Sequence, residues 1–303
     1  MAQIFAMGAV GFWLVRRGFV DATGLKLLSW LSINVAFPFF IFNQLINHFD
    51  PLAQSHWWAY PLINIGLGLT GFLVAAACAI LLRCKQPREW VAVSALHNAG
   101  YIPLLFITML PAGEPQVIYP YMILSIVGFD LCLWSLGAWL IAYRTKAVIN
   151  WRNFINPPLV AMTIAFIMVL LGLKGFLPDI VLKPIKVIGD SALAMAMLTI
   201  GGNLALTSFD QLKWKEVSGA VLIKLIVLPV LALVFLCLVP VDPIFAFILI
   251  IQACMPTSIT LSVIARNNDN TRQDFINQAI FISHVLCAVT IPLFLGLYGK
   301  LIH

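Results

Sequence analysis

The sequence predicts an all-α polytopic membrane protein, with ten transmembrane helices arranged as two inverted five-helix repeats and with crossed, broken helices 4 and 9. Hydrophobic residues make up 62% of the 303 positions and charged residues only 10%, whereas a soluble domain is about half apolar and about a quarter charged. Ten apolar runs can be counted, and about 20 residues cross a bilayer as a helix. Two of these runs are interrupted in the middle, at matching places in the two halves.

The ten predicted spans follow one another with short connections. They lie near residues 2–15, 24–46, 57–82, 89–110, 117–142, 155–173, 184–206, 216–239, 243–265 and 273–299. The first run is short for a span, but it lacks the basic region and the small-residue cleavage site of a signal peptide. We therefore interpret it as a helix.

The basic residues predict the orientation of the chain. Most of the Lys and Arg fall in alternate loops, among them Arg16, Arg17, Arg83, Lys85 and Arg88. By the positive-inside rule these loops are cytoplasmic. We therefore expect a multi-pass protein of the inner or plasma membrane, with both termini on the outer side of that membrane. The basic residues of these loops account for the net charge of +6. The charge therefore reflects membrane topology, and we expect the lipid bilayer rather than nucleic acid as a partner. The lysines between the sixth and seventh spans run against this assignment.

Five spans in each half require the halves to be inserted in opposite directions, because five is an odd number. We place the first inverted repeat at residues 1–148 and the second at 149–303. Arg17-Gly18-Phe19 and Lys174-Gly175-Phe176 follow the first span of each half, about 157 residues apart. Inverted repeats of this kind hold their substrate at the repeat interface, near the bilayer midplane.

Each interrupted span contains helix-breaking and polar residues where lipid could not satisfy the freed backbone groups. The half-helix that begins at such a break suits a carboxylate, while the carbonyls that end the preceding half suit Na⁺ or a proton donor. We expect the two breaks to face each other and to bind substrate. The candidate substrate-binding residues are Asn98, Gly100, Tyr101 and Pro103 in the first break, Pro256, Thr257 and Ser258 in the second, and Asn43 in the second span.

Ionisable residues within spans are costly, so each is a functional candidate. Asp130 has two interpretations: a coupling residue that carries a proton or binds a cation, or a buried group hydrogen-bonded to a broken helix. His284 is interpreted either as a coupling residue, since imidazole titrates near neutral pH, or as a neutral packed histidine. For Lys224 the alternatives are pairing with an anionic substrate or a carboxylate, and a stem that reaches toward the cytoplasmic surface. His97 most simply caps a loose carbonyl at the first break.

The sequence gives little support for an enzyme. Ser94 and His97 share a helix face, but no GxSxG or HExxH motif and no further acid–base partner accompanies them. The six cysteines show no CxxC spacing, which indicates packing residues rather than a metal site. We expect no cofactor beyond a coupling H⁺ or Na⁺. A channel and a signalling sensor remain as alternatives.

Short motifs in chain order carry a family resemblance. They are Asn98-x-Gly100-x-Ile102-Pro103-Leu104, Asn156-Pro157-Pro158, the segment 192–202 (ALAMAMLTIGG), Lys224-Leu225-x-x-Leu228-Pro229, Met255-Pro256-Thr257 and Thr290-Ile291-Pro292-Leu293. With these motifs the chain resembles the auxin efflux carrier family, which includes the plant PIN exporters and a bacterial organic-acid, malonate-type branch. The resemblance implies a fold similar to that of sodium/proton antiporters and bile-acid transporters.

The resemblance also implies secondary active transport of a small organic anion, with a carboxylate at the crossing contacted by Asn98. Proton or Na⁺ coupling and alternating access at the crossing are the function we expect. An uncoupled, auxin-like exporter of organic anions or a channel-like facilitator is the alternative. Asp130 falls where PIN members carry a neutral polar side chain, which argues for coupling and against an auxin-like substrate. A homodimer remains open.

Overall fold

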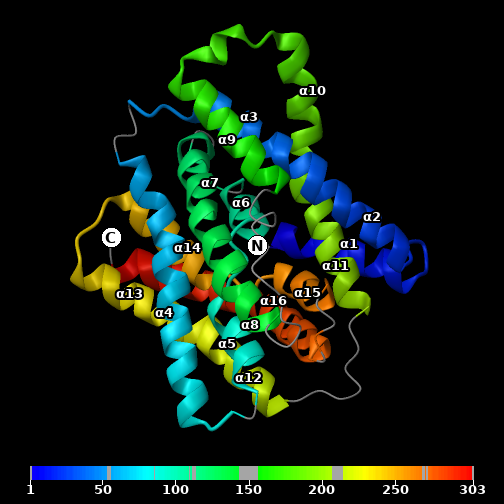
Figure 1. Ribbon diagram of the computed structural model, residues 1–303, viewed down its shortest axis with the longest axis vertical. Coiled ribbons are helices and arrows are strands. Elements are labelled where there is room, and N and C mark those ends of the chain that lie inside the picture. The colour runs from blue at the N-terminus through cyan, green and yellow to red at the C-terminus, as the bar shows by residue number, and fades with distance from the viewer. Residues whose placement is uncertain are drawn as a thin grey trace. The chain divides into compact units, whose positions relative to one another are not determined.

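The computed structural model describes residues 2–52, 56–84, 86–108, 110, 114–142, 156–206, 214–267, 270 and 272–301. Within these ranges the chain is helical, with no strand and a single isolated antiparallel bridge (Figure 1). The predicted all-α class is confirmed. The boundary between the two predicted repeats, at residues 148 and 149, falls outside the described residues.

Among the described residues, five helical segments are long and apolar enough to cross a membrane. They are Ala22–His48, Trp57–Leu81, Glu114–Ile141, Trp214–Leu238 and Gln273–Leu301. Shorter apolar helices are Ala6–Arg16, Pro157–Leu170 and Pro243–Cys254. This pattern fits a polytopic membrane protein, while the number of ten spans and their inverted topology stay predictions.

The chain divides into two compact units, and each unit draws on both halves of the sequence. The first contains residues 1–58, 104–124 and 151–206, and the second contains residues 59–103, 125–150 and 207–303. Helices of the first unit are α1 (Ala2–Arg16), α2 (Ala22–Leu31), α3 (Phe37–His48), α9 (Pro157–Leu170), α10 (Asp179–Asp190) and α11 (Ala192–Leu206). Helices of the second unit are α4 (Tyr60–Leu81), α5 (Pro87–Ala95), α8 (Ala138–Ala142), α12 (Trp214–Leu222), α13 (Leu228–Leu238), α14 (Pro243–Cys254), α15 (Thr260–Asn267) and α16 (Gln273–Leu301). Two of the boundaries between the units fall inside helices, in α6 (Tyr101–Ile107) and in α7 (Glu114–Cys132).

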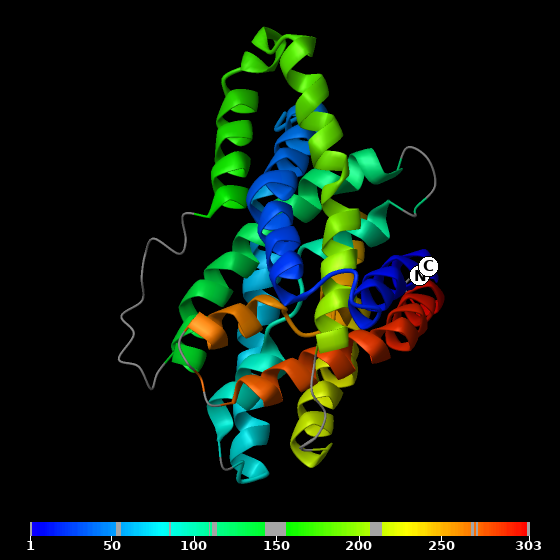
Figure 2. The same cartoon turned by 90° about the vertical axis from the view of Figure 1, so that its right-hand side faces the viewer.

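In the first unit, α1 and α11 pack at backbone distance. A Cβ atom added to Gly201 would lie 1.8 Å from the carbonyl oxygen of Gly8, so only glycine allows this approach. Small residues commonly serve this purpose between membrane helices. Helices α9 and α10 of the same unit form a hairpin, which Figure 2 shows from the side.

In the second unit, α4 packs closely against the end of α5. A Cβ atom on Gly71 would lie 3.0 Å from the Cα atom of Ala95, the last residue of α5. Similarly, a Cβ atom on Gly68 would lie 2.8 Å from the sulfur of Cys132. Gly71 thus holds α4 beside the point where α5 stops, which is where the first interruption begins, and Gly68 holds α4 beside the end of α7.

In the described part of the chain, three long helices contain a π-helical turn: η1 (Ser32–Ala36), η3 (Leu133–Gly137) and η7 (Ile223–Val227). Two of these turns end two residues before a proline, because Pro38 and Pro229 are the second residues of α3 and α13. Proline lacks an N–H group and crowds a carbonyl in the preceding turn, and a π turn is a common way to accommodate such a defect. Lys224 belongs to the turn η7.

Candidate functional site

The two interruptions that the sequence predicts are present and lie against each other within the second unit. Helix α5 ends at Ala95 and α6 begins at Tyr101, while α14 ends at Cys254 and α15 begins at Thr260. Between these helices the backbone is extended. The two extended segments pair as an antiparallel bridge at His97 and Thr257.

Two backbone hydrogen bonds hold the crossing together. The Asn98 N–H donates to the Pro256 carbonyl at 2.7 Å, and the Ser258 N–H donates to the Leu96 carbonyl at 3.0 Å. Each break therefore supplies partners for backbone groups that the other break exposes, as a non-helical segment at membrane depth requires. The expectation that Asn98 lies beside Pro256 is confirmed.

Of the two prolines assigned to the breaks, one lies where the sequence predicted and the other does not. Pro256 lies in the second gap, as expected, and its carbonyl accepts the bond from Asn98. Pro103 is instead the third residue of α6, where a helical N–H has no intrahelical partner and its loss costs little. The first break consequently ends before Pro103, and this residue lies in the first turn of the second half-helix.

Side chains from three other elements of the second unit support the first break. The amide nitrogen of Asn64, in α4, donates to the Ser125 carbonyl at 2.8 Å, and its Oδ1 lies 2.9 Å from Nε2 of His97. Gln252, in α14, donates from Nε2 to the Ala99 carbonyl and to Ser125 Oγ, both at 3.1 Å. These contacts fix the conformation of a segment that has no helical hydrogen bonds of its own.

The second break is held by its own threonine and by α16. The Thr257 hydroxyl donates to the Val93 carbonyl at 2.9 Å, and the Thr257 N–H donates to Ser283 Oγ at 3.2 Å. Ser283 is buried in α16 beside His284. Thr257, predicted as a substrate ligand, thus uses its hydroxyl to tie the crossing to α5.

Three polar atoms at or beside the crossing have no hydrogen-bond partner in the described part of the chain. They are Nδ2 of Asn98, Nδ1 of His97 and Nε2 of His284. Asn98 is only 6% exposed, and a buried amide donor without a partner carries a desolvation cost. Since Asn64 Oδ1 is an acceptor, His97 donates to it from Nε2, and the His97 ring also interacts with the side chain of Gln252. Groups of this kind are those that a polar ligand would satisfy.

Lys224 is 1% exposed, so the structure contradicts the alternative in which its stem reaches the cytoplasmic surface. Its ammonium group lies within electrostatic range of His97 and Cys254. None of the salt bridges found between described residues involves Lys224. The Lys224 amine is therefore enclosed in the second unit, near the first break, without a described carboxylate partner within 4.0 Å.

The other candidates are distributed as follows. Asp130 is half-buried in α7, next to Phe129, whose ring centroid lies 5.4 Å from that of His97. His284 donates from Nδ1 to the Ile280 carbonyl at 2.7 Å, one turn earlier in α16. Asn43 lies in α3, in the first unit, and is therefore not part of the pairing that forms the crossing.

Gly100 and Tyr101 mark the end of the first gap and the start of α6, and both are half-buried. Ser258 is buried and takes part in the crossing through its backbone N–H. The sequence interpretation missed Asn64, Ser125, Gln252 and Ser283. Each is a polar residue inside an apolar run, and this signal could have identified them as partners of freed backbone groups.

The comparison with protein families gives a match over nearly the whole chain. A family model described as membrane transport protein matches residues 1–148 and residues 143–295. The comparison with curated proteins finds no match. Both interruptions, the buried Lys224 and the supporting side chains fall within the matched residues.

Proposed function

The chain belongs to the membrane transport protein family, and from that premise we propose that it is a secondary carrier for a small organic anion, driven by a proton or Na⁺ gradient. The observation that carries the proposal is the hydrogen-bonded crossing of the two interrupted segments, with free polar atoms beside it. Interrupted helices in corresponding halves of a membrane protein are typical of transporter binding sites. A carboxylate or dicarboxylate is the substrate class that this chemistry fits best.

The chemistry of the crossing favours an anion. Asn98 has an unused amide donor, and Lys224 contributes a buried positive charge without a carboxylate partner among the described residues. Helix α15 begins at the second break, at Thr260, and its first N–H groups add a partial positive charge. A bound carboxylate would satisfy the amide donor and offset the ammonium group, with hydrogen bonds strengthened by charge.

Alternating access requires the crossing to open to one side of the membrane at a time. The two backbone bonds and the contacts from Asn64, Gln252 and Ser283 bind the crossing into the second unit. We expect this unit to move as one body, because a break that changed shape would lose the partners of its own backbone. The substrate then travels with an intact site.

Coupling is assigned to Asp130, with His284 and Lys224 as further candidates. Transfer of one charge across the membrane potential supplies about 2.3 kcal/mol per 100 mV, and a proton gradient adds to this. Asp130 in α7 is one residue from Phe129, which packs on His97. A change of charge at Asp130 would therefore occur close to the first break.

The test uses purified protein in proteoliposomes with short mono- and dicarboxylates. We expect counterflow of labelled against unlabelled substrate, and accumulation that follows an imposed pH or Na⁺ gradient. Asp130→Asn should abolish gradient-driven accumulation while leaving counterflow intact. Undiminished accumulation by this variant would remove Asp130 from the mechanism, and absence of counterflow with every carboxylate would contradict the carrier proposal.

One observation favours the uncoupled alternative, an organic-anion exporter or channel-like facilitator. Lys224 is buried and forms no salt bridge with a carboxylate among the described residues. An anion could then bind and leave without an accompanying cation. Transport that follows the membrane potential but ignores pH and Na⁺ would select this alternative, and single-channel current steps would identify a channel.

An enzyme is the alternative with the least support. Ser94 donates its hydroxyl to the Trp90 carbonyl of its own helix at 2.7 Å, and His97 directs Nε2 to Asn64. The pair that shares a helix face in the sequence therefore does not form a nucleophile–base contact. The matched family is one of transporters.

A further inference from the structure

A side chain of α5 ties this helix to α12 near the start of each. The Trp90 indole N–H donates to the Glu216 carbonyl of α12 at 2.9 Å. The Trp90 ring also lies against α12 at Gly219, where an added Cβ atom would be 3.5 Å from it. Trp90 is buried, so these contacts fix the first turns of the two helices against each other.

Arg272 fastens the start of α16 to the same part of α12. Its guanidinium forms an ion pair with the Glu216 carboxylate, and its guanidinium carbon lies 4.2 Å from the ring centroid of Phe275, in α16. Arg272 is 7% exposed, whereas the ion pairs of α10 join side chains that are about half exposed or more. Because a buried charge is costly to leave unpaired, this contact should hold its partners more firmly than an exposed pair does.

Asn270 extends the cluster to α8 and to the first turn of α5. Its Nδ2 donates to the Ile141 carbonyl at 2.8 Å and to Glu89 Oε1 at 3.3 Å. Its Oδ1 accepts the Arg272 N–H at 2.8 Å. Glu89 is buried in the first turn of α5, where free N–H groups favour a negative charge. We call the set Glu89, Trp90, Glu216, Asn270 and Arg272 the polar clamp.

The helices that the polar clamp joins lead to the transport site. Trp90 precedes Ala95, the last residue before the first break, by five residues, and Glu216 precedes Lys224 by eight residues on one continuous helical segment. At 1.5 Å per residue these separations are about 8 and 12 Å. Helix α5 also packs against η7, the turn that carries Lys224. The polar clamp therefore sets how the first break lies relative to this lysine.

We propose that Arg272 is a positioning residue of the transport site. Through its ion pair with Glu216 it fixes α12 and α16 against α5, and so holds Lys224 and Asn98 at a constant separation. This inference rests on the proposed function, in which these two side chains bind one carboxylate. Two groups act together on a ligand only when both are in place, and a shift of about 1 Å can cost roughly 100-fold.

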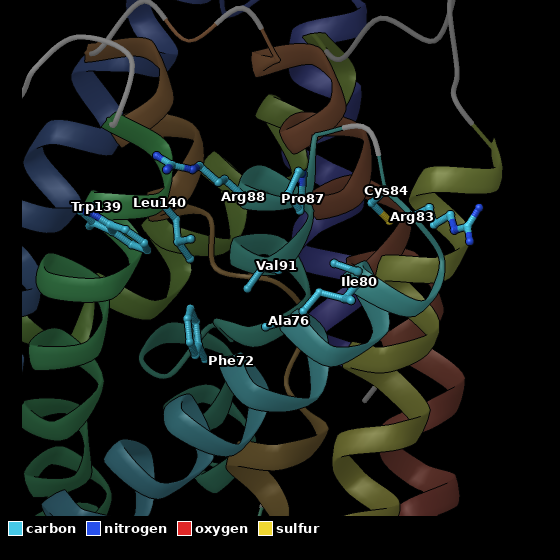
Figure 3. A pocket seen from close by; sticks show the side chains of 11 residues that line it. Phe72, Ala76, Ile80, Arg83, Cys84, Pro87, Arg88, Val91, Trp139 and Leu140 are labelled. Carbon is cyan, nitrogen blue, oxygen red and sulfur yellow. The ribbon is translucent and has the colours of Figure 1, made fainter.

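Cys84 reports on the ion pair. It lines a groove between α4, α5 and α8 together with Pro87, the first residue of α5 (Figure 3). Burial and the Glu216 carboxylate raise the pKa of the Cys84 thiol, and Arg272 lowers it. Since the thiolate is the form that reacts, alkylation of Cys84 should be slower in Arg272→Gln and faster in Glu216→Gln. Rates unchanged in both variants would show that the ion pair does not form and would overturn the proposal.

Hydrogen exchange tests the positioning without substrate, on the purified full chain. Arg272→Gln should speed amide exchange in residues 96–100, the first break, by about tenfold, because α5 is held less firmly at its start. Lys215→Gln removes a positive charge from an exposed position of α12, next to Glu216, and should leave this exchange unchanged. Equal exchange in wild type and Arg272→Gln, or equal acceleration by Lys215→Gln, would overturn the proposal.

Binding of acetate and malonate, followed by thermal shift, separates positioning from a general loss of structure. Arg272→Gln should weaken binding about tenfold in the wild-type background and less than about threefold in Asn98→Ala, because the amide to be positioned is then absent. Equal losses in the two backgrounds would reject positioning. Should wild type bind neither carboxylate, the proposed function fails, and the exchange result still decides whether Arg272 positions the break.

Two further variants guard against misfolding. Arg272→Lys keeps the charge but not the planar contact with Phe275, and it should restore most of the affinity that Arg272→Gln loses. Glu216→Gln removes the same ion pair from its half-exposed side and should reproduce the faster exchange in the first break. If Arg272→Gln does not fold, Glu216→Gln decides, and unchanged exchange in that variant would reject the proposal.

Discussion

The two breaks of the crossing use their polar groups in different ways. In the second break a side chain of the break itself has a structural role, since the Thr257 hydroxyl donates a hydrogen bond to the Val93 carbonyl. The first break is supported from outside, by Asn64 and Gln252, and its own Asn98 amide stays unused among the described residues. One break thus anchors the crossing, and the other leaves an amide without a described partner, which we propose binds the ligand. Matching positions in two similar segments need not have matching roles.

The largest effect on transport is expected from Lys224, the charge near the first break. Lys224→Met should reduce uptake of an organic anion by more than about 100-fold, because the charge that offsets the substrate is lost. The same change should raise the free energy of unfolding by about 1–4 kcal/mol, since an unpaired buried charge is replaced by an apolar side chain. Proteoliposome uptake and denaturant unfolding measure the two effects.

Lys215→Met is the matched control, because Lys215 is an exposed lysine of α12, nine residues before Lys224 on the same continuous helical segment. It should change neither quantity by a measurable amount. Full transport by Lys224→Met would show that the first break does not use this charge.

Asn98→Ala should reduce substrate affinity by about 10–100-fold, which corresponds to loss of one hydrogen bond to a charged group. Its unfolding free energy should change little, since the amide donor has no partner among the described residues to lose. Substrate-dependent thermal shifts measure affinity. A variant that loses stability rather than affinity would assign Asn98 to structure and remove the contrast between the two breaks.

Thr257→Val should behave in the opposite way. The change keeps the shape of the side chain but leaves the Val93 carbonyl without its donor, at a cost of about 1–3 kcal/mol in unfolding free energy. The affinity of the folded fraction for substrate should stay within about threefold of wild type, a change of under 1 kcal/mol. Thr257→Ser, which retains the hydroxyl, should restore most of the stability. A loss of substrate affinity with an unchanged free energy of unfolding would show that Thr257 binds substrate, which is the role we assign to Asn98.

The smallest effect is expected from Ser283→Ala. This variant removes the acceptor of the Thr257 N–H, a neutral bond of 3.2 Å, and should cost about 0.5–1.5 kcal/mol. Chemical unfolding in detergent detects a change of this size. A larger loss of transport than of stability would indicate that α16 contributes to the ligand site as well as to the anchor.

The sequence predicts the positions of both breaks, because lipid cannot satisfy the backbone groups that proline and glycine free within an apolar run. It also predicts that Asn98 and Pro256 lie together, which the 2.7 Å backbone bond confirms. It misplaces Pro103, because a proline signals a nearby helix boundary without saying on which side of it the residue lies. Pro103 lies in the first turn of a helix, whereas Pro256 stands outside one.

The roles of side chains at the crossing are less predictable. Composition cannot tell that Thr257 turns its hydroxyl to Val93 while Asn98 leaves its amide free of described partners, because both depend on which segment passes within hydrogen-bond distance. The burial of Lys224 is likewise set by packing, since its long apolar stem can reach either way from the same backbone position. Coupling by Asp130 stays a prediction, as do the substrate class and the ten-span topology.

The π turn that carries Lys224 has a consequence for how this helix could have arisen. A π turn closes i→i+5 hydrogen bonds and so takes up one residue more than a regular helical turn. Deleting a single residue within 223–227 should therefore restore a regular turn while α13 keeps nearly the same face toward its neighbours. The place of Lys224 in a widened turn shortly before Pro229 depends on one surplus amino acid, a change that a single in-frame codon insertion could produce.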